Sequence, residues 1–246
     1  MADWTGSSPH AVKLIAALED SIATAKVEFS ICGWQITPYY LSRVAAAVRE
    51  GKIGVEEWTA GTAYYDPGYA PRPGASPKDE ENMFYVSFPT GGRPHIVGDP
   101  LYVEAPYFTT ATKEFVNNRA LVIHEAVHAI HDMFNRPITV LDDEASAYIA
   151  QAIYCLDNSN EYRERWKDWR NNGDMCVEAC PLALRVLEGV SNPDVRCRND
   201  YTELKYKISR RPKYQKFDWK DKSGYNGIGG FTPGEPPYCP GGLYGS

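Results

Sequence analysis

The chain has 246 residues, of which 43% are hydrophobic and 24% charged, a composition typical of a globular protein with a substantial core. Its formal net charge of −6 argues against nucleic acid or an anionic membrane surface as the main partner. We expect no signal peptide in the first residues. We also expect no membrane-spanning segment, because no apolar run approaches the roughly 20 residues that a bilayer requires.

Two amphipathic helices are expected at the start of the chain. Residues 9–29 carry apolar side chains at helical spacing, and residues 31–36 form a short extended piece. A second helix begins after Thr37, with a proline in its first turn, and stops at Gly51. We interpret residues 1–51 as a scaffold with no chemistry of its own.

The pattern changes in the next segment, where Gly and Pro separate short runs rich in β-branched and aromatic residues. A small antiparallel sheet is predicted, with strands over residues 53–58, 62–65, 83–88, 95–97 and 101–103. The Pro-rich loop 66–77 is either a flap over a cleft or an ordinary surface loop. Residues 82–86 are a candidate edge strand. Peptidases use such an edge to hold an extended substrate, although an ordinary core strand is the commoner outcome.

The chemically most informative stretch is a His-Glu-x-x-His motif in an apolar run free of Gly and Pro, which predicts a helix. This helix is expected to run from near residues 110–113 to Met133 or Phe134. His124 and His128 then lie one turn apart on one face, so both imidazoles can reach a single Zn²⁺ at roughly 2.0–2.1 Å. Glu125 is placed to hold a water molecule and accept its proton. An ordinary helix with a chance match is the alternative.

The third zinc ligand is expected at the start of the next helix, roughly residues 142–156, because a short turn brings it back alongside the motif. Glu144 has the longest reach and is the assigned ligand. Asp142 and Asp143 are alternatives whose ordinary roles are helix cap and dipole partner. His131 is another alternative, but it lies about 10 Å along the axis from the first motif histidine. That distance favours a residue that contacts a ligand rather than the metal, one that lines the cleft, or one at the surface.

At these residues the chain resembles the thermolysin-like zincins, whose zinc helix reads His-Glu-x-x-His-Ala-Val-x-Asp; residues 124–132 are similar to it. The Asp-Glu-Ala at 143–145 resembles the Asn-Glu-Ala that supplies their third ligand. Residues 82–85, Asn-Met-Phe-Tyr, are similar to their Asn-Ala-Phe-Trp substrate strand. The resemblance implies a zincin-like fold, zinc ligands His124, His128 and Glu144, and the general base Glu125.

The chain also departs from that family. Where the family has an Asp four residues after the glutamate ligand, this chain has Tyr148, and the linker between the second His and the Glu is shorter. It has no histidine after His131, whereas the family uses a downstream His to stabilise the oxyanion. A tyrosine would have to do so, or the metal and backbone alone. Tyr148 is the first candidate, with packing against the motif helix as its alternative. The chain thus resembles a compact member of the glutamate-ligand zincins.

The C-terminal part is expected to be helical and then irregular. Helices are predicted over residues 162–170, 177–188 and 201–208, with Pro181 in the first turn of the second or kinking it. Basic and aromatic residues alternate between residues 205 and 222, which is either a solvated face or a polyanion-binding surface. We expect one α+β domain over residues 1–246, divided into a helical scaffold (1–51), a sheet with loops (52–109), a zinc-binding helix pair (110–156), a helical part (157–223) and an irregular tail (224–246).

Six cysteines are present, with no Cys-x-x-Cys spacing, which argues against a zinc ribbon or a thioredoxin motif. They are Cys32, Cys155, Cys176, Cys180, Cys197 and Cys239. The even count and 17 tyrosines favour disulfides and export, while free buried thiols in a reducing compartment are the alternative. Cys176 and Cys180 lie one turn apart and are expected to bond elsewhere rather than to each other.

Together these features predict a zinc-dependent endopeptidase, monomeric and acting on a protein or peptide substrate, as either a digestive protease or a toxin. Three alternatives stay open. A zinc hydrolase of a non-peptide amide would use the same residues. A non-catalytic zinc-containing binding module would close its coordination sphere with a fourth protein ligand. A polyanion-binding protein would show steep salt dependence.

Overall fold

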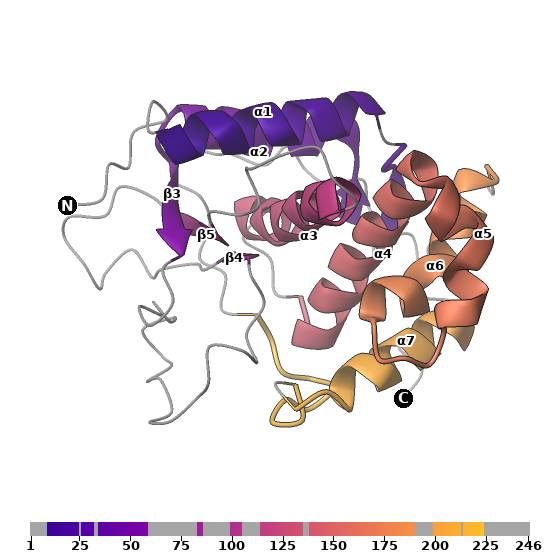
Figure 1. The fold of residues 1–246 in the computed structure, drawn as a ribbon. Helices are drawn as coiled ribbons and strands as arrows, with labels where there is room; N and C mark the ends of the chain where they lie inside the picture. Colours follow the sequence, from indigo (N-terminus) through magenta and orange to yellow (C-terminus); the bar gives the residue numbers. More distant parts are fainter. Residues whose placement is uncertain are drawn as a thin grey trace.

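The computed structural model describes residues 9–24, 26–31, 34–58, 83–85, 99–104, 114–134, 138–189, 199–212 and 214–223. These parts are mainly helical with two small sheets, so the α+β class predicted at a coarse level is confirmed (Figure 1). Several predicted features lie outside the described residues: strands 62–65 and 95–97, loop 66–77, tail 224–246, Cys32, Cys197 and Cys239. None of the described helices is long and apolar enough to cross a membrane.

The N-terminal scaffold consists of α1 (Pro9–Thr24) and α2 (Pro38–Arg49), joined through the antiparallel strands β1 (Phe29–Ile31) and β2 (Trp34–Ile36). The helix predicted over 9–29 was too long, because its last apolar positions belong to the approach to β1 and to β1 itself. The second helix follows the prediction closely. Its N-cap is Thr37, whose hydroxyl accepts from Tyr40 N at 3.4 Å, and Gly51 follows its end with a φ of 70°.

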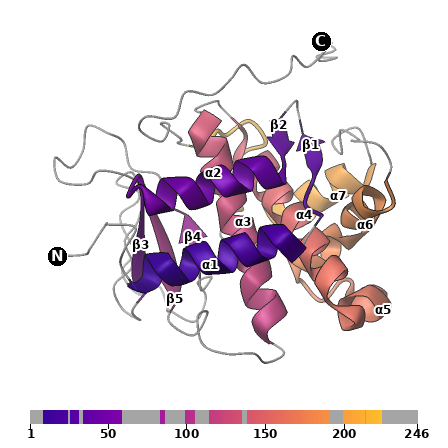
Figure 2. The ribbon, with the colours of Figure 1, turned by 90° about the horizontal axis from the view of Figure 1, so that it is seen from above.

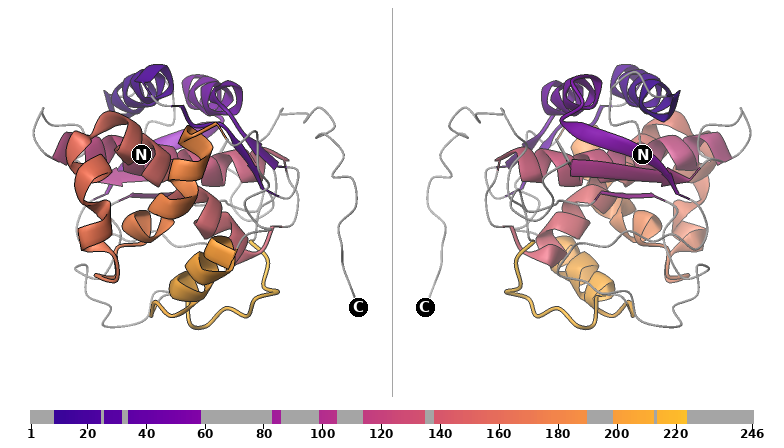
Figure 3. Two further views of the ribbon diagram at one scale, coloured as in Figure 1. Left: turned by 90° about the vertical axis from the view of Figure 1, so that its right-hand side faces the viewer. Right: turned by 90° about the vertical axis from the view of Figure 1, so that its left-hand side faces the viewer.

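The larger sheet has the order β3–β5–β4, with β3 (Ile53–Trp58), β5 (Asp99–Glu104) and β4 (Met83–Tyr85). β3 and β5 are parallel, whereas β4 and β5 are antiparallel, so the prediction of an antiparallel sheet was wrong for one of its two pairings. The long connection between β3 and β5 permits a parallel return, which a tight hairpin would not. This sheet lies at the opposite end of the molecule from α5 and α6 (Figures 1 and 3).

Two long helices form the centre of the fold: α3 (Glu114–Phe134) and α4 (Val140–Asn158). α1 and α2 run side by side across α3 (Figure 2). α4 packs against α3 and, along another face, against α6 (Met175–Leu187). Its fully buried alanines, at positions 145, 147, 150 and 152, allow this close packing.

The remaining helices are α5 (Asn160–Trp169) and α7 (Asn199–Ser209), which together with α6 enclose the far side of α4. The three helices predicted in this part of the chain are confirmed, each within about two residues at its ends. α6 begins at Met175 after its N-cap Asp174, so Pro181 lies inside the helix rather than in its first turn.

Candidate metal centre

Helix α3 presents His124, Glu125 and His128 as one buried group. Their relative exposures are 1%, 1% and 7%, and one potential ligand atom from each lies within 4.8 Å of the others. The two imidazole rings are one turn apart, with centroids separated by 5.0 Å. A buried His/Glu/His group that could hold a metal ion is therefore present where the motif predicted it.

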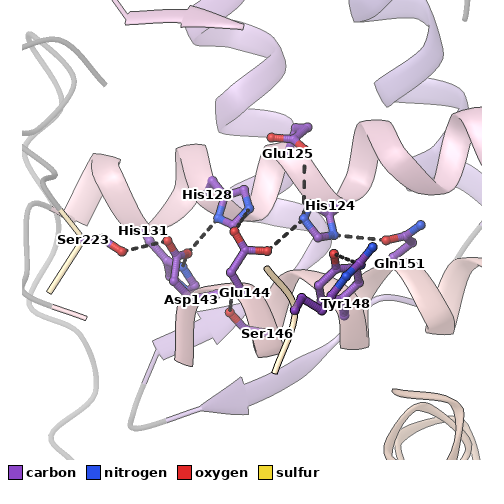
Figure 4. Close-up of polar contacts among 11 residues, drawn as sticks. His124, Glu125, His128, His131, Asp143, Glu144, Ser146, Tyr148, Gln151 and Ser223 are labelled. Atoms are coloured by element: carbon purple, nitrogen blue, oxygen red, sulfur yellow. Dashed lines mark hydrogen bonds and ion pairs between the residues drawn. The ribbon is translucent and has the colours of Figure 1, made fainter. Parts of the chain in front are cut away.

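Glu144, on the first turns of α4, faces both histidines (Figure 4). Its Oε2 lies 3.6 Å from His124 Nε2, and its Oε1 lies 3.8 Å from His128 Nε2. The carboxylate reaches this position because α3 and α4 are joined by a short connection and pack against each other. The same His124 Nε2 is 3.9 Å from Glu125 Oε1. Two carboxylates thus lie on the Nε2 side of the two imidazoles.

The opposite nitrogen of each imidazole is held by an oxygen acceptor from α4. His124 Nδ1 is 3.0 Å from Gln151 Oε1, and His128 Nδ1 is 2.8 Å from Asp143 Oδ1. Because these oxygens can only accept, Nδ1 of each ring carries a proton, and in the neutral imidazole the lone pair of Nε2 faces the carboxylate of Glu144. His124 Nε2 is buried and has no hydrogen-bond partner among the residues that the structure describes. This arrangement fits a bound metal ion.

Asp143 organises a second group of side chains beside the centre. Its Oδ1 accepts from His131 Nδ1 at 2.7 Å as well as from His128, and its Oδ2 accepts from Ser223 Oγ at 2.9 Å. His131 is fully buried and points to Asp143, which excludes the surface role considered for it and places it beside the centre. Asp143 is therefore an orienting residue in addition to its place in the first turn of α4.

Asp142 points away from the metal centre, toward α7. Its Oδ1 accepts from Tyr201 Oη and from Lys205 Nζ, each at 2.7 Å. The N-cap of α4 is Thr139, whose hydroxyl accepts from the backbone N of Asp142 at 3.1 Å. The two neighbouring aspartates thus have different surroundings, which makes them a matched pair for experiments.

Electrostatics at the centre favour a cation. Burial lowers the pKa of His128, but the charge and hydrogen bond of Asp143 act in the opposite direction. Together with the charges of Glu144 and Glu125 they outweigh burial and raise the pKa of this imidazole to about 10. For Asp143 the signs are reversed. Burial raises the pKa of its carboxyl group, but the two histidine partners outweigh burial and hold this pKa far below its ordinary value. A buried site of such negative potential suits a proton or a divalent cation.

Tyr148 lies one turn after Glu144 and packs against the centre. Its ring contacts that of His124 edge-on, with centroids 4.6 Å apart, and its hydroxyl accepts from Arg211 Nη1 at 3.3 Å. The packing alternative considered from the sequence therefore describes a contact that is present. Arg211 lies in the segment after α7 and carried no local signal that would have associated it with the motif.

Two further residues of the centre were not predicted from the sequence. Gln151 lies seven residues after Glu144, and two helical turns bring it to the same side of α4, a spacing that could have identified it. Ser223 is 80 residues from Asp143 in the chain and had no such signal. It is held there because Val140 N donates to Asp221 O and Ser223 N to Ile138 O, each at 2.9 Å. An isolated bridge pairs Thr139 with Lys222.

Comparison of the chain with models of protein families, with curated proteins and with solved structures finds no match.

Proposed function

We propose that this protein is a zinc-dependent endopeptidase with a zincin-like centre. Its zinc ligands are His124, His128 and Glu144, and its general base is Glu125. The observation that carries the proposal is the orientation of the two imidazoles, whose Nδ1 atoms are held by oxygen acceptors while both Nε2 atoms face one carboxylate. A pair of histidines that served only to fill the core would not need this shared direction.

The donor set supports zinc in particular. Two imidazole nitrogens and one carboxylate oxygen are ligands that Zn²⁺ accepts, and three protein ligands leave the fourth position open, as in catalytic sites. Zinc bound there would lower the pKa of a water molecule and polarise the carbonyl of a substrate.

Glu125 supplies the proton transfers of the proposed reaction. Its carboxylate accepts a proton from the attacking water as the water oxygen bonds to the carbonyl carbon. When the carbon–nitrogen bond breaks, the same carboxyl group returns the proton to the leaving amine. Its place next to His124 in the sequence, on the same buried helix, holds it beside the ligands throughout.

Tyr148 is the proposed stabiliser of the developing oxyanion. Its hydroxyl accepts from Arg211, and a phenol hydroxyl can donate to a substrate oxygen as well as accept. Replacement of Tyr148 by Phe preserves the ring contact with His124 and removes only the hydroxyl. A fall in kcat of about 10²-fold with little change in KM supports the role. Unchanged kcat would leave Tyr148 as a packing residue.

An extended peptide is the proposed substrate, held along β4. This strand is at the edge of the larger sheet as far as the described strands go, and it lies beside α3. A free strand edge binds peptides through their backbone and tolerates many side chains, which is the requirement of an endopeptidase.

The test combines metal analysis of the purified chain with cleavage of a mixed peptide library. We expect about one zinc per chain and cleavage that a chelator abolishes and added zinc restores. Glu125→Gln is the matched control, since it keeps the shape and the ligands but should lose at least about 10²-fold in cleavage rate. Full activity in this variant would exclude Glu125 as the base.

Other outcomes identify the alternatives. A library left intact while simpler amides are hydrolysed, with the same dependence on Glu125, indicates a zinc hydrolase of a non-peptide amide. Tight zinc binding with no hydrolysis of either substrate class indicates a non-catalytic binding module.

A further inference from the structure

Three buried cysteines gather on the side of α4 that faces α6. Cys155 on α4 and Cys176 and Cys180 on α6 have relative exposures of 0%, 2% and 0%. The Sγ atoms of Cys155 and Cys176 are 3.8 Å apart, although the two residues are 21 positions apart in the chain. Cys180 differs from them, because its thiol donates to the backbone carbonyl of Cys176 within its own helix at 3.5 Å.

We propose that Cys155 and Cys176 form a disulfide when the chain folds in an oxidising compartment, and that this bond ties α4 to α6. Two sulfur atoms at 3.8 Å are already in van der Waals contact. A bond of about 2.05 Å needs only a modest rotation of the two side chains, because the helices that carry them are packed together. The metal-centre residue Gln151 lies one turn before Cys155, so the bond would brace the helix that also carries Glu144.

The competing pairings are less favourable. Cys176 and Cys180 lie on consecutive turns of one helix, so a bond between them would bridge no two elements and would distort the helix. Cys155 and Cys180 would have to pair past Cys176, whose sulfur already contacts that of Cys155.

The oxidant is a small disulfide such as oxidised glutathione. The thiolate of one cysteine attacks it and releases one glutathione thiol, which leaves a mixed disulfide on the chain. The other cysteine attacks this mixed disulfide, forms the Cys155–Cys176 bond and releases the second glutathione. Two cysteine thiols are oxidised and one glutathione disulfide is reduced to two thiols.

The reaction belongs to the folding process rather than to the folded protein. The hydrogen bond to Cys155 together with burial raises the pKa of Cys176, and burial raises that of Cys180. A thiolate is therefore disfavoured in this core, and an external disulfide has no access to fully buried sulfur. Once formed, the bond is protected from reduction for the same reason.

The full-length chain is refolded from the reduced, denatured state in a buffer of oxidised and reduced glutathione. Remaining thiols are then blocked in denaturant, and the disulfides are mapped by proteolysis and mass spectrometry. We expect a peptide pair joined through Cys155 and Cys176, with Cys180 blocked as a thiol. The midpoint of thermal unfolding should lie about 5–10 °C above that of the reduced protein, because the bond restricts the unfolded chain.

Cys180→Ala is the matched control, since it removes a thiol from the same core and should keep both the bond and the shift in midpoint. Cys155→Ala and Cys176→Ala should lack both. Mapping of the unaltered chain decides the question even if a variant folds poorly. Recovery of Cys155 and Cys176 as blocked thiols, or bonded to other cysteines, would overturn the proposal.

Discussion

Two buried ionic clusters in this protein differ in how their charge is balanced. The metal centre lies between α3 and α4. The second, here called the Glu178 cluster, consists of Glu178 on α6 with Lys207, Arg170 and the backbone N of Asn171. Lys207 Nζ lies 2.6 Å from Glu178 Oε2, and Asn171 N donates to Glu178 Oε1 at 2.5 Å. Both clusters bury carboxylates in the same helical core.

The two clusters differ in the cations that face their carboxylates. Glu178 faces a lysine and an arginine, which carry their charge at any physiological pH. Asp143 and Glu144 face imidazoles, which are cations only when protonated. The Glu178 cluster is thus balanced by permanent charges of the chain itself, as a structural ion pair is. A proton or a bound metal ion would balance the candidate metal centre, which is why we assign chemistry to this centre and not to the Glu178 cluster.

The largest expected effect is the loss of metal from His128→Ala. The variant removes one imidazole ligand, and the metal content after dialysis should fall from about one ion per chain to a trace. Lys207→Met changes the Glu178 cluster instead and should keep full metal content. Atomic spectrometry of both variants makes the comparison. Loss of metal from Lys207→Met would show that the two clusters are not independent.

The next largest effect is expected from Asp143, which orients His128, and its neighbour Asp142 serves as the control. Asp143→Ala removes the oxygen that holds His128 Nδ1, and zinc affinity should fall by about 10–100-fold. Asp143→Asn keeps an acceptor oxygen and should recover part of that affinity. Asp142→Ala should leave it unchanged, because Asp142 faces Tyr201 and Lys205. Competition with a zinc chelator of known affinity measures all three, and equal losses in Asp142→Ala and Asp143→Ala would contradict the assignment.

A smaller effect is expected on stability in the Glu178 cluster. Lys207→Met leaves the buried Glu178 carboxylate with fewer compensating charges, and the free energy of unfolding should fall by about 1–2 kcal/mol. Lys167→Met, at an exposed position on α5, is the control and should change it by less than about 0.5 kcal/mol. Urea denaturation of the metal-loaded proteins gives both values. Equal denaturation midpoints for Lys207→Met and Lys167→Met would show that the Glu178 cluster does not contribute to stability.

The smallest expected effect is on the stability of the fold at acidic pH. Burial raises the pKa of Glu178, but hydrogen bonds from Lys207 and Asn171 outweigh burial and lower the pKa below its ordinary 4.5. Because the folded pKa is the lower one, ionised Glu178 stabilises the fold above about pH 4.5, and this contribution is lost as the pH falls through the folded pKa. Glu178→Gln should therefore show a shallower loss of stability in acid than the unaltered chain. Identical slopes in urea titrations between pH 3 and 6 would argue against it.

Local sequence signals predicted most of the helices well. α2 is bounded by Thr37 and Gly51, and α4 has the acidic first turn that the sequence predicted, because capping and first-turn charges depend on neighbours in the chain. The N-cap of α4, however, is Thr139 rather than one of the two aspartates, and the helix begins at Val140, two residues before the predicted start. The error at the end of α1 has the opposite cause. Apolar residues in a β-strand can match a helical spacing over one turn, and only pairing with a partner strand distinguishes the two. The direction of β3 relative to β5 depends on a connection of some forty residues, which no local pattern encodes.

By itself, the sequence determined which side chains of α3 form the candidate metal centre and that Glu144 approaches them. Helical periodicity places His124 next to His128, and a short connection brings the following helix alongside. The tertiary structure decided what surrounds them. Hydrogen bonds to Gln151 and Asp143 orient the two imidazoles. Packing between elements also brings Ser223 to Asp143 from 80 residues away and places Cys155 in contact with Cys176. The physical reason is the distance along the chain over which each feature is set. A helix repeats every 3.6 residues, so a short stretch of sequence is enough to predict it, whereas the partner of a buried polar atom depends on how distant elements pack.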